Sequence, residues 1–227
     1  MKVIITGSTG LVGSAVIREA IANSSITHAF VLSRKDLPKE ISDNAKVTVI
    51  PHADFSTYPD DLLAQLAGCE ACIWAIGGRA TQFPDLDTFR KVSVDYTLAA
   101  ARAFKQHLAP ALPGGQRFRF VFCSGMLAEW DQQKSLLFMA DTRLVKSLQG
   151  QVEKGLCDLA DKDSRFDSFC PRPSGILPLT VGTLGKLAGK LYGAIQVQDL
   201  AKALVHIALN GAEKQIIEAG ELTALHK

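Results

Sequence analysis

Val3-Ile4-Ile5-Thr6-Gly7-Ser8-Thr9-Gly10-Leu11-Val12-Gly13 reads as a short apolar run followed by a T-G-x-x-G-x-x-G turn, and the helix-compatible stretch Ser14–Ala22 comes next. In a strand–turn–helix arrangement, the first glycine permits a tight reversal, the second lets a pyrophosphate approach the backbone, and the third lets the helix pack close to the strand. The phosphates then bind free N–H groups at the helix N-terminus. The sequence therefore predicts a dinucleotide-binding turn formed by Gly7, Ser8, Thr9, Gly10, Leu11, Val12 and Gly13.

The length and composition of the chain predict one compact domain. It has 227 residues, of which 47% are hydrophobic, and a formal net charge of +2. A near-neutral mixture of charges lacks the concentrated basic face that nucleic-acid binding needs. No apolar stretch reaches the roughly 18 residues of a membrane span, and the most apolar late segment is interrupted by Lys186 and Lys190. Because the first strand is expected to begin at Lys2, we expect no cleavable signal peptide and a cytoplasmic protein.

Five cysteines without regular spacing predict reduced thiols and no bound metal. The pair Cys69 and Cys72 has C-x-x-C spacing, but Cys72 begins an apolar run that is typical of a buried strand. We therefore expect no redox or metal function for this pair.

Strand-like and helix-like segments alternate at the spacing of βαβ units. The strand-like runs lack polar alternation, which indicates a parallel sheet that is covered on both faces. They lie at Ala29–Leu32, Val47–Ile50, Ile73–Ile76, Phe118–Cys123 and Phe166–Cys170, with helix-like segments at Pro59–Ala67, Asp87–His107 and Thr142–Leu159. Right-handed crossovers then predict a doubly wound, mostly parallel α/β fold of strand order 3-2-1-4-5-6, with an edge strand near Lys214–Glu218.

The residues at the end of the second strand predict the cofactor. This strand should end beside the adenosine ribose, where a carboxylate would bind both ribose hydroxyls and repel a 2′-phosphate. The chain has Ser33, Arg34 and Lys35 there instead. Because the planar fork of Arg34 can bind a phosphate through two N–H groups, the sequence favours NADP(H) over NAD(H). The alternative is a solvated basic turn, and the nearby Asp36 keeps that alternative open.

Further motifs follow the predicted strands. They are Asp54-Phe55, Ala75-Ile76-Gly77-Gly78, Ser124-Gly125, Arg172-Pro173-Ser174-Gly175 and, at the start of a late helix, Val197-Gln198-Asp199-Leu200-Ala201. With the glycine turn, they resemble the atypical short-chain dehydrogenase/reductases, and most closely the Tat-interacting-protein-like oxidoreductases, over nearly the whole chain. The resemblance implies that Asp54 accepts a hydrogen bond from the adenine amino group and that Ala75, Ile76 and Gly77 pass under the adenosine. It also implies that Pro173 and Ser174 place backbone near the nicotinamide.

The chain departs from this family at the catalytic motif. The family usually carries Y-x-x-x-K on the helix after the fifth strand, where the tyrosine exchanges a proton with the substrate oxygen and the lysine holds the nicotinamide ribose. The best local match is Thr142-Arg143-Leu144-Val145-Lys146. A threonine hydroxyl is shorter and far less acidic than a phenol, whose pKa is about 10, so Lys146 is expected to bind cofactor without its catalytic partner. Ser124, a bound water, Asp141 and Tyr192 stay open as proton sources, and Ser124, Thr142 and Lys146 are the candidate catalytic residues.

Three functions remain open. The protein reduces a small apolar carbonyl compound with a non-standard proton donor, or it is a redox-silent NADP(H)-binding protein that acts through partners, or it catalyses a dehydration or isomerisation on the same fold. Only 55 residues follow Arg172, so we expect a small helical lid at 176–196 rather than a second domain. A lid of that size suits a small, largely apolar substrate.

Overall fold

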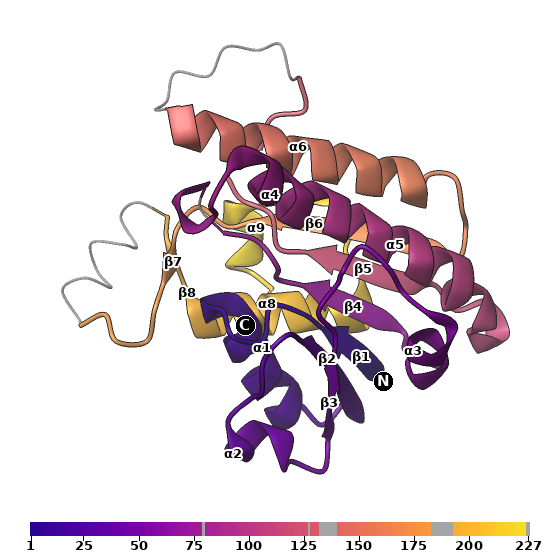
Figure 1. Ribbon diagram of the computed structural model, residues 1–227. Coiled ribbons are helices and arrows are strands. Elements are labelled where there is room, and N and C mark those ends of the chain that lie inside the picture. Colours follow the sequence, from indigo (N-terminus) through magenta and orange to yellow (C-terminus); the bar gives the residue numbers. More distant parts are fainter. Residues whose placement is uncertain (79, 127, 132–139, 183–192, 226–227) are drawn as a thin grey trace.

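The computed structural model describes residues 1–78, 80–126, 128–131, 140–182 and 193–225, without the side chains of 80 and 140–144 (Figure 1). Strands and helices alternate along most of the chain, as the sequence predicted. The strands are β1 (Lys2–Ile5), β2 (His28–Ser33), β3 (Val47–Pro51), β4 (Ala71–Trp74), β5 (Phe118–Phe122), β6 (Phe166–Arg172), β7 (Ile176–Leu177), β8 (Ile195–Gln196) and β9 (Ile216–Glu218). The α-helices are α1 (Leu11–Ala22), α2 (Lys39–Ser42), α3 (Asp60–Gln65), α4 (Leu86–Arg90), α5 (Tyr96–His107), α6 (Ala140–Ala160), α8 (Val197–Asn210) and α9 (Ala219–Leu222).

Seven strands form one parallel sheet of order β3-β2-β1-β4-β5-β6-β9. This confirms the doubly wound order 3-2-1-4-5-6, and β9 is the edge strand that was expected near Lys214–Glu218. The order reverses at β1, which pairs with β2 on one side and with β4 on the other. Ligands of open α/β sheets bind at such a switch point, beyond the carboxyl ends of the strands.

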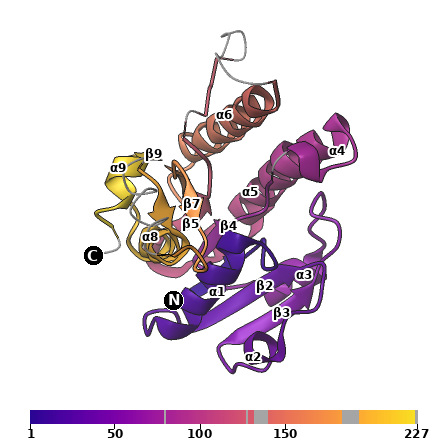
Figure 2. The ribbon, with the colours of Figure 1, turned by 90° about the vertical axis from the view of Figure 1, so that its left-hand side faces the viewer.

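Apolar helices cover both faces of the sheet, which is why the strands are apolar throughout. One face is packed by side chains of α3, α4, α5 and α6, and the other by side chains of α1, α2, α8 and α9. Figure 2 shows α5 and α6 on one side of the strands and α1 and α8 on the other. In the central strands, Ile4 of β1, Cys72 of β4 and Phe120 of β5 are completely buried between these layers.

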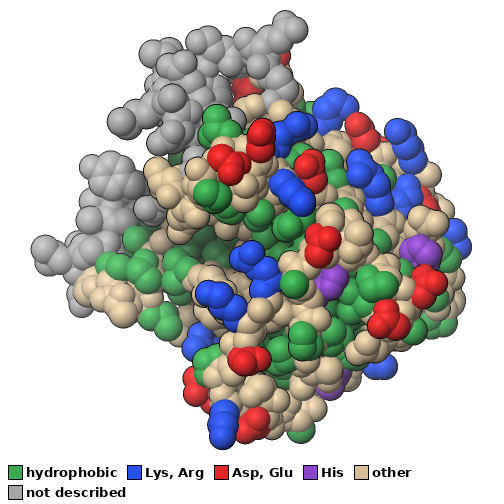
Figure 3. Space-filling view, in the orientation of Figure 1, with side chains coloured by type: hydrophobic (Ala, Val, Ile, Leu, Met, Phe, Trp, Pro, Cys, Tyr) green, Lys and Arg blue, Asp and Glu red, His purple; other side chains and the backbone are tan. Residues whose placement is uncertain are grey.

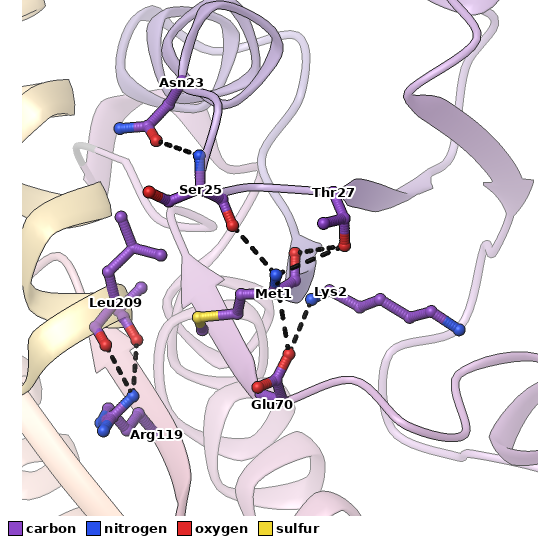
Figure 4. Close-up of polar contacts among 9 residues, drawn as sticks. Met1, Lys2, Asn23, Ser25, Thr27, Glu70, Arg119 and Leu209 are labelled. Carbon is purple, nitrogen blue, oxygen red and sulfur yellow. Dashed lines mark hydrogen bonds and ion pairs between the residues drawn. The ribbon is translucent and has the colours of Figure 1, made fainter.

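Polar contacts fix the amino end of the sheet (Figure 4). The backbone N–H of Lys2 in β1 donates to Glu70 Oε2 at 2.9 Å, just before β4 begins. Arg119 in β5 donates from one guanidinium nitrogen to the carbonyl oxygens of Ala208 and Leu209, at 3.2 and 2.9 Å. Because those carbonyl groups end α8, the cation also lies at the negative end of the helix dipole. These contacts leave the opposite, carboxyl edge for ligands.

Most expected elements differ from the observed ones by one to three residues at an end, and two of the differences affect the carboxyl edge. The fourth strand was expected at Ile73–Ile76, but β4 ends at Trp74, so Ala75, Ile76 and Gly77 lie beyond the strand. The helix expected at Asp87–His107 is divided into α4, a π-helical turn at Lys91–Asp95, and α5. A π turn carries one extra residue and often marks a functional site. Hydrophobic periodicity alone does not reveal it.

The expected lid at 176–196 falls largely outside the described residues, because 183–192 are not described. Its two ends are described, and they meet as the parallel pair β7 and β8, in which Ile176 pairs with Ile195. Among the described helices, none has the length and apolar composition of a bilayer-crossing segment.

Candidate cofactor site and adjoining cavity

The glycine turn connects β1 to α1 at the centre of the carboxyl edge. Gly7 has a φ of 70°, in the left-handed region that favours glycine, and a Cβ there would overlap the carbonyl group of Ala75. A Cβ at Gly13 would overlap the carbonyl group of Gly7. The backbone N–H of Ala75 donates to Thr6 Oγ1 at 3.2 Å, which ties the turn to the end of β4. The first turn of α1 has no side-chain cap, so its backbone N–H groups face the edge without a capping partner from Gly10.

The first cavity, of about 190 Å³, opens beside this turn. Eleven residues that the sequence predicted as cofactor-binding line it: Gly7, Ser8, Thr9, Gly10, Ser33, Arg34, Lys35, Phe55, Ala75, Ile76 and Gly77. The remaining lining residues, which sequence reasoning missed, are Leu32, Phe83, Val92 and Tyr96. The last three are apolar or aromatic: Phe83 precedes α4, Val92 belongs to the π turn and Tyr96 begins α5. The π turn that carries Val92 has no sequence signature.

The three polar residues after β2 divide into two kinds. Ser33 is buried, and its hydroxyl donates to the backbone carbonyl of Lys35 at 2.6 Å while accepting from Ser8 Oγ at 2.9 Å. The Ser33 hydroxyl therefore makes most of its hydrogen bonds within the protein, and these bonds stabilise the turn after β2. The side chains of Arg34 and Lys35 are exposed at the mouth of the cavity. Figure 3 shows Lys and Arg side chains gathered beside a hollow lined by hydrophobic side chains.

Asp54 does not line either cavity, although its neighbour Phe55 lines the first. Asp54 Oδ1 accepts from the Ser56 hydroxyl at 2.5 Å and from the Ser56 backbone N–H at 3.0 Å. These hydrogen bonds hold the pKa of the Asp54 carboxyl below its usual value. Asp54 thus stabilises the turn after β3, and its second oxygen is the one available for the adenine contact that the family resemblance implies.

A second cavity, of about 520 Å³, adjoins the first and shares Gly10, Ala75, Ile76 and Gly77 with it. Five more predicted residues line this cavity: Leu11, Val12, Ser124, Pro173 and Ser174. The two cavities therefore form one groove that crosses the switch point of the sheet. The Ser174 hydroxyl donates to the carbonyl oxygen of Gly193, which ties this wall to the β8 side of the groove.

A buried carboxylate, Glu153, lies behind Ser124. Its side chain is completely buried, and its Oε1 accepts from the Ser124 hydroxyl at 2.6 Å. Its Oε2 accepts from Trp130 Nε1 at 2.8 Å, and Arg172 donates to both oxygens at 2.5 and 2.9 Å. The hydrogen bonds to Glu153 raise the pKa of the Arg172 guanidinium, which also pairs with Glu218 at 2.9 Å. Charge pairing and hydrogen bonds together compensate the burial of this carboxylate.

Sequence reasoning assigned no role to Glu153. The available signal was a charged residue next to Val152 on the otherwise apolar face of α6, since a buried charge needs partners. Its partners come from the loop after β5 and from β6, and a single sequence does not show which distant residues will meet.

The α6 wall of the second cavity is formed by Val145 and Gln149. Lys146 is described but does not line either cavity, and burial lowers the pKa of its ammonium group. The side chains of Thr142 and Asp141, and all of Tyr192, lie outside the described residues. Of the described residues that line this cavity, the only titratable one is Cys123, and burial raises the pKa of its thiol to about 12.

Ser93 belongs to the π turn and lines the second cavity opposite β5. Its hydroxyl oxygen is buried and has no hydrogen-bond partner among the described residues. A buried hydroxyl without a partner costs free energy unless a ligand or water completes it. The π turn therefore adds a polar group to the cavity that sequence reasoning missed.

Comparison with known proteins gives one family and a common fold. A family model described as NAD(P)H-binding matches residues 7–210. The leucinostatins biosynthesis cluster protein T of Purpureocillium lilacinum is 36% identical over 124 residues, which are 55% of this chain and 42% of that protein. The mitochondrial protein FMP52 of Kluyveromyces lactis is 29% identical over 86 residues, 37% of this chain and 38% of that protein. Each alignment thus covers less than half of the relative.

Solved structures share the architecture at low sequence identity. A short-chain dehydrogenase/reductase from Saccharomyces cerevisiae superposes with a TM-score of 0.72 at 11% identity, covering 99% of this chain and 98% of that one. Gre2 from Candida albicans, solved in complex with NADPH, superposes with a TM-score of 0.70 at 15% identity, covering 96% of this chain and 77% of that one. At these identities the likeness shows the fold alone.

Proposed function

This chain belongs to the NAD(P)H-binding family and has the fold of the atypical short-chain dehydrogenase/reductases. From that premise we propose that the protein binds NADP(H) in its groove and reduces a small apolar carbonyl compound there. The observation that carries the proposal is the continuous pair of cavities along the carboxyl edge, joined at Gly10, Ala75, Ile76 and Gly77. The adenosine half of the cofactor would occupy the first cavity. The nicotinamide half and the substrate would share the second.

The preference for the phosphorylated cofactor rests on Arg34 and Lys35. Both are exposed at the mouth of the first cavity, and neither is paired with a carboxylate at salt-bridge distance in the described part of the chain. A guanidinium group binds phosphate oxygens through two parallel hydrogen bonds. Ser33 supports this geometry by accepting from the backbone N–H of Lys35 at 3.3 Å.

The test is a titration of the purified chain with NADPH and with NADH, followed by cofactor fluorescence. We expect NADPH to bind more tightly, and Arg34→Ala to weaken NADPH by about tenfold or more, because a hydrogen bond to a charged group contributes about 1.5–3 kcal/mol. NADH affinity should change little. Arg18→Ala, which removes an exposed cation from α1, is the matched control and should bind like the wild type. Equal affinity of the wild type for NADPH and NADH would overturn the NADP assignment.

Bound NADPH would supply a hydride to the carbonyl carbon, so the product oxygen needs a proton. Ser124 lies in the second cavity, but its hydroxyl already donates to Glu153. A proton from water therefore suits this site better than a proton from a side chain, and the absence of a positioned acid lowers the rate by a factor of about 10²–10⁴. We propose slow turnover with small apolar aldehydes, ketones or quinones.

The redox-silent function is the second candidate, and one observation favours it. Among the described lining residues of the second cavity, Cys123 alone is titratable, and its raised pKa keeps it a neutral thiol near pH 7. A panel of aldehydes, ketones and quinones with NADPH, followed at 340 nm, separates the two functions. Oxidation of NADPH above the background without enzyme supports the reductase. Tight NADPH binding with no turnover across the panel supports the silent cofactor-binding protein.

We also propose a cytoplasmic location. All five cysteines are free thiols, as expected in a reducing compartment. Fractionation of cells that express the tagged chain tests the proposal, and recovery with mitochondria, in keeping with the name of the FMP52 relative, would overturn it.

A further inference from the structure

We propose that Gln149 is the polar contact that α6 makes with the bound dinucleotide, in the place where the sequence predicted Lys146. The inference rests on the proposed function, because it assigns a residue to the nicotinamide half of the same cofactor. It replaces a charged contact with a neutral amide, which both donates and accepts hydrogen bonds.

The lining of the second cavity is the first step. Val145 and Gln149, one helical turn apart, form the α6 wall, and Lys146 lies between them in sequence without reaching the cavity. The same cavity includes Gly10, Leu11 and Val12 at the start of α1. A dinucleotide whose phosphates bind that turn therefore extends its second nucleoside towards the wall that carries Gln149.

The position of the Gln149 side chain is the second step. A Cβ at Gly125 would come within 2.9 Å of both Nε2 and Oε1 of Gln149, so the amide lies directly against Gly125, the residue after Ser124. One residue further along α6, Gly150 packs against the backbone of Glu129, where any side chain would overlap it. These two contacts hold the loop after β5 and the helix together. They place the Gln149 amide beside Ser124 at the cavity wall.

The chemistry of the two neighbours is the third step. The Ser124 hydroxyl donates to the completely buried Glu153, which lies one turn after Gln149 on α6. Arg172 pairs with that carboxylate, and the Ser124 proton is directed at its Oε1 at 2.6 Å. Ser124 thus offers an acceptor to the cavity, and Gln149 offers both a donor and an acceptor. Vicinal hydroxyls, such as those of the second ribose, match such a pair because each hydroxyl both donates and accepts.

The experiment compares NADPH with adenosine 2′,5′-bisphosphate, which lacks the nicotinamide nucleoside and the bridging phosphate attached to it. Both are titrated into the wild type, Gln149→Ala and Lys146→Ala. We expect Gln149→Ala to weaken NADPH about tenfold and to leave adenosine 2′,5′-bisphosphate within twofold of the wild type. Lys146→Ala should bind both ligands within twofold of the wild type. Unchanged binding of the small nucleotide also shows that the variant is folded.

Three results would overturn the inference. They are unchanged NADPH affinity in Gln149→Ala, an equal loss for both ligands in that variant, and a loss of NADPH affinity in Lys146→Ala as large as in Gln149→Ala. A wild-type chain that binds neither ligand refutes the proposed function itself, and this inference with it. If the wild type binds NADPH and Gln149→Ala binds it equally well, this inference fails and the proposed function stands.

Discussion

At the scale of single residues, the site depends on how closely two pieces of backbone approach. Gly13 is buried against the carbonyl group of Gly7, and Gly7 is in turn against the carbonyl group of Ala75. These contacts stack the glycine turn, the start of α1 and the end of β4 with no side chain between them. The surface that would bind the phosphates therefore depends on the lack of side chains at Gly7 and Gly13.

Gly13→Ala tests this close approach. The added methyl group must move α1 away from the turn, and overpacking of this kind costs about 1–3 kcal/mol. We expect a lower melting temperature together with a loss of NADPH affinity. Gly220→Ala is the matched control, because a Cβ there meets nothing within 4 Å. An alanine at 13 that leaves both the melting temperature and the affinity unchanged would contradict the close packing.

At the scale of secondary-structure elements, α6 contributes both to the core packing and to the wall of the second cavity. It packs against α5 and β6, forms one wall of the second cavity through Val145 and Gln149, and inserts Glu153 beneath Ser124. Arg172 at the end of β6 and Trp130 in the loop after β5 both donate to Glu153. One carboxylate thus connects three elements that meet at the cavity floor.

Glu153→Ala should destabilise the chain strongly. Removing one partner of a buried ion pair leaves the other charge uncompensated and costs about 3–5 kcal/mol, whereas an exposed pair contributes about 0–1 kcal/mol. We expect a large fall in the urea midpoint for Glu153→Ala and a smaller one for Glu153→Gln. Lys154→Ala, which removes an exposed pair with Asp158 on the same helix, should change the midpoint little. Equal midpoints for the alanine variants at 153 and 154 would refute the structural role of Glu153.

The elements also show what the sequence could and could not reveal. Strand order, the glycine turn and most of the first cavity follow from local patterns: apolar runs, glycine spacing and the residues after each strand. The cavity-facing positions of α6 do not. A helix of 21 residues offers several pairs at i and i+4, and Thr142 with Lys146 fits the spacing as well as Val145 with Gln149. The pair that faces the cavity depends on tertiary contacts, such as Gly150 against Glu129, that lie outside local sequence.

The same limit explains the missed residues near α4 and α5. A π turn needs one extra residue within a helix, and no residue type requires it. The position of Ser93 in the cavity, and of Val92 and Tyr96 beside it, was therefore invisible to periodicity.

At the scale of the whole molecule, the groove crosses the middle of the sheet, where the strand order reverses. The first cavity is lined by residues that follow β1, β2, β3 and β4, and the second by residues that follow β1, β4, β5 and β6. A ligand along this groove would therefore contact both halves of the fold. Binding should stabilise the folded chain as one unit.

Thermal unfolding tests that coupling. A ligand at 100 times its dissociation constant stabilises the native state by about 2.7 kcal/mol, which corresponds to a rise of roughly 5–10 °C in melting temperature for a chain of this size. We expect NADPH to produce such a rise in the wild type and a smaller one in Arg34→Ala at the same concentration. A single transition that shifts as a whole is expected. Two transitions, of which only one responds to NADPH, would contradict binding across both halves.

The packing of α1 against α8 has a consequence for synthesis on the ribosome. Val16 and Ile17 of α1 and Leu204 and Ile207 of α8 are completely buried in one cluster on the same face of the sheet, although α1 ends at Ala22 and α8 begins only at Val197. At about 5–20 residues per second, α1 waits roughly ten seconds or longer for this partner. During that time the face of α1 that will pack against α8 is exposed on the nascent chain. Chaperones that bind apolar faces can bind it until α8 is made.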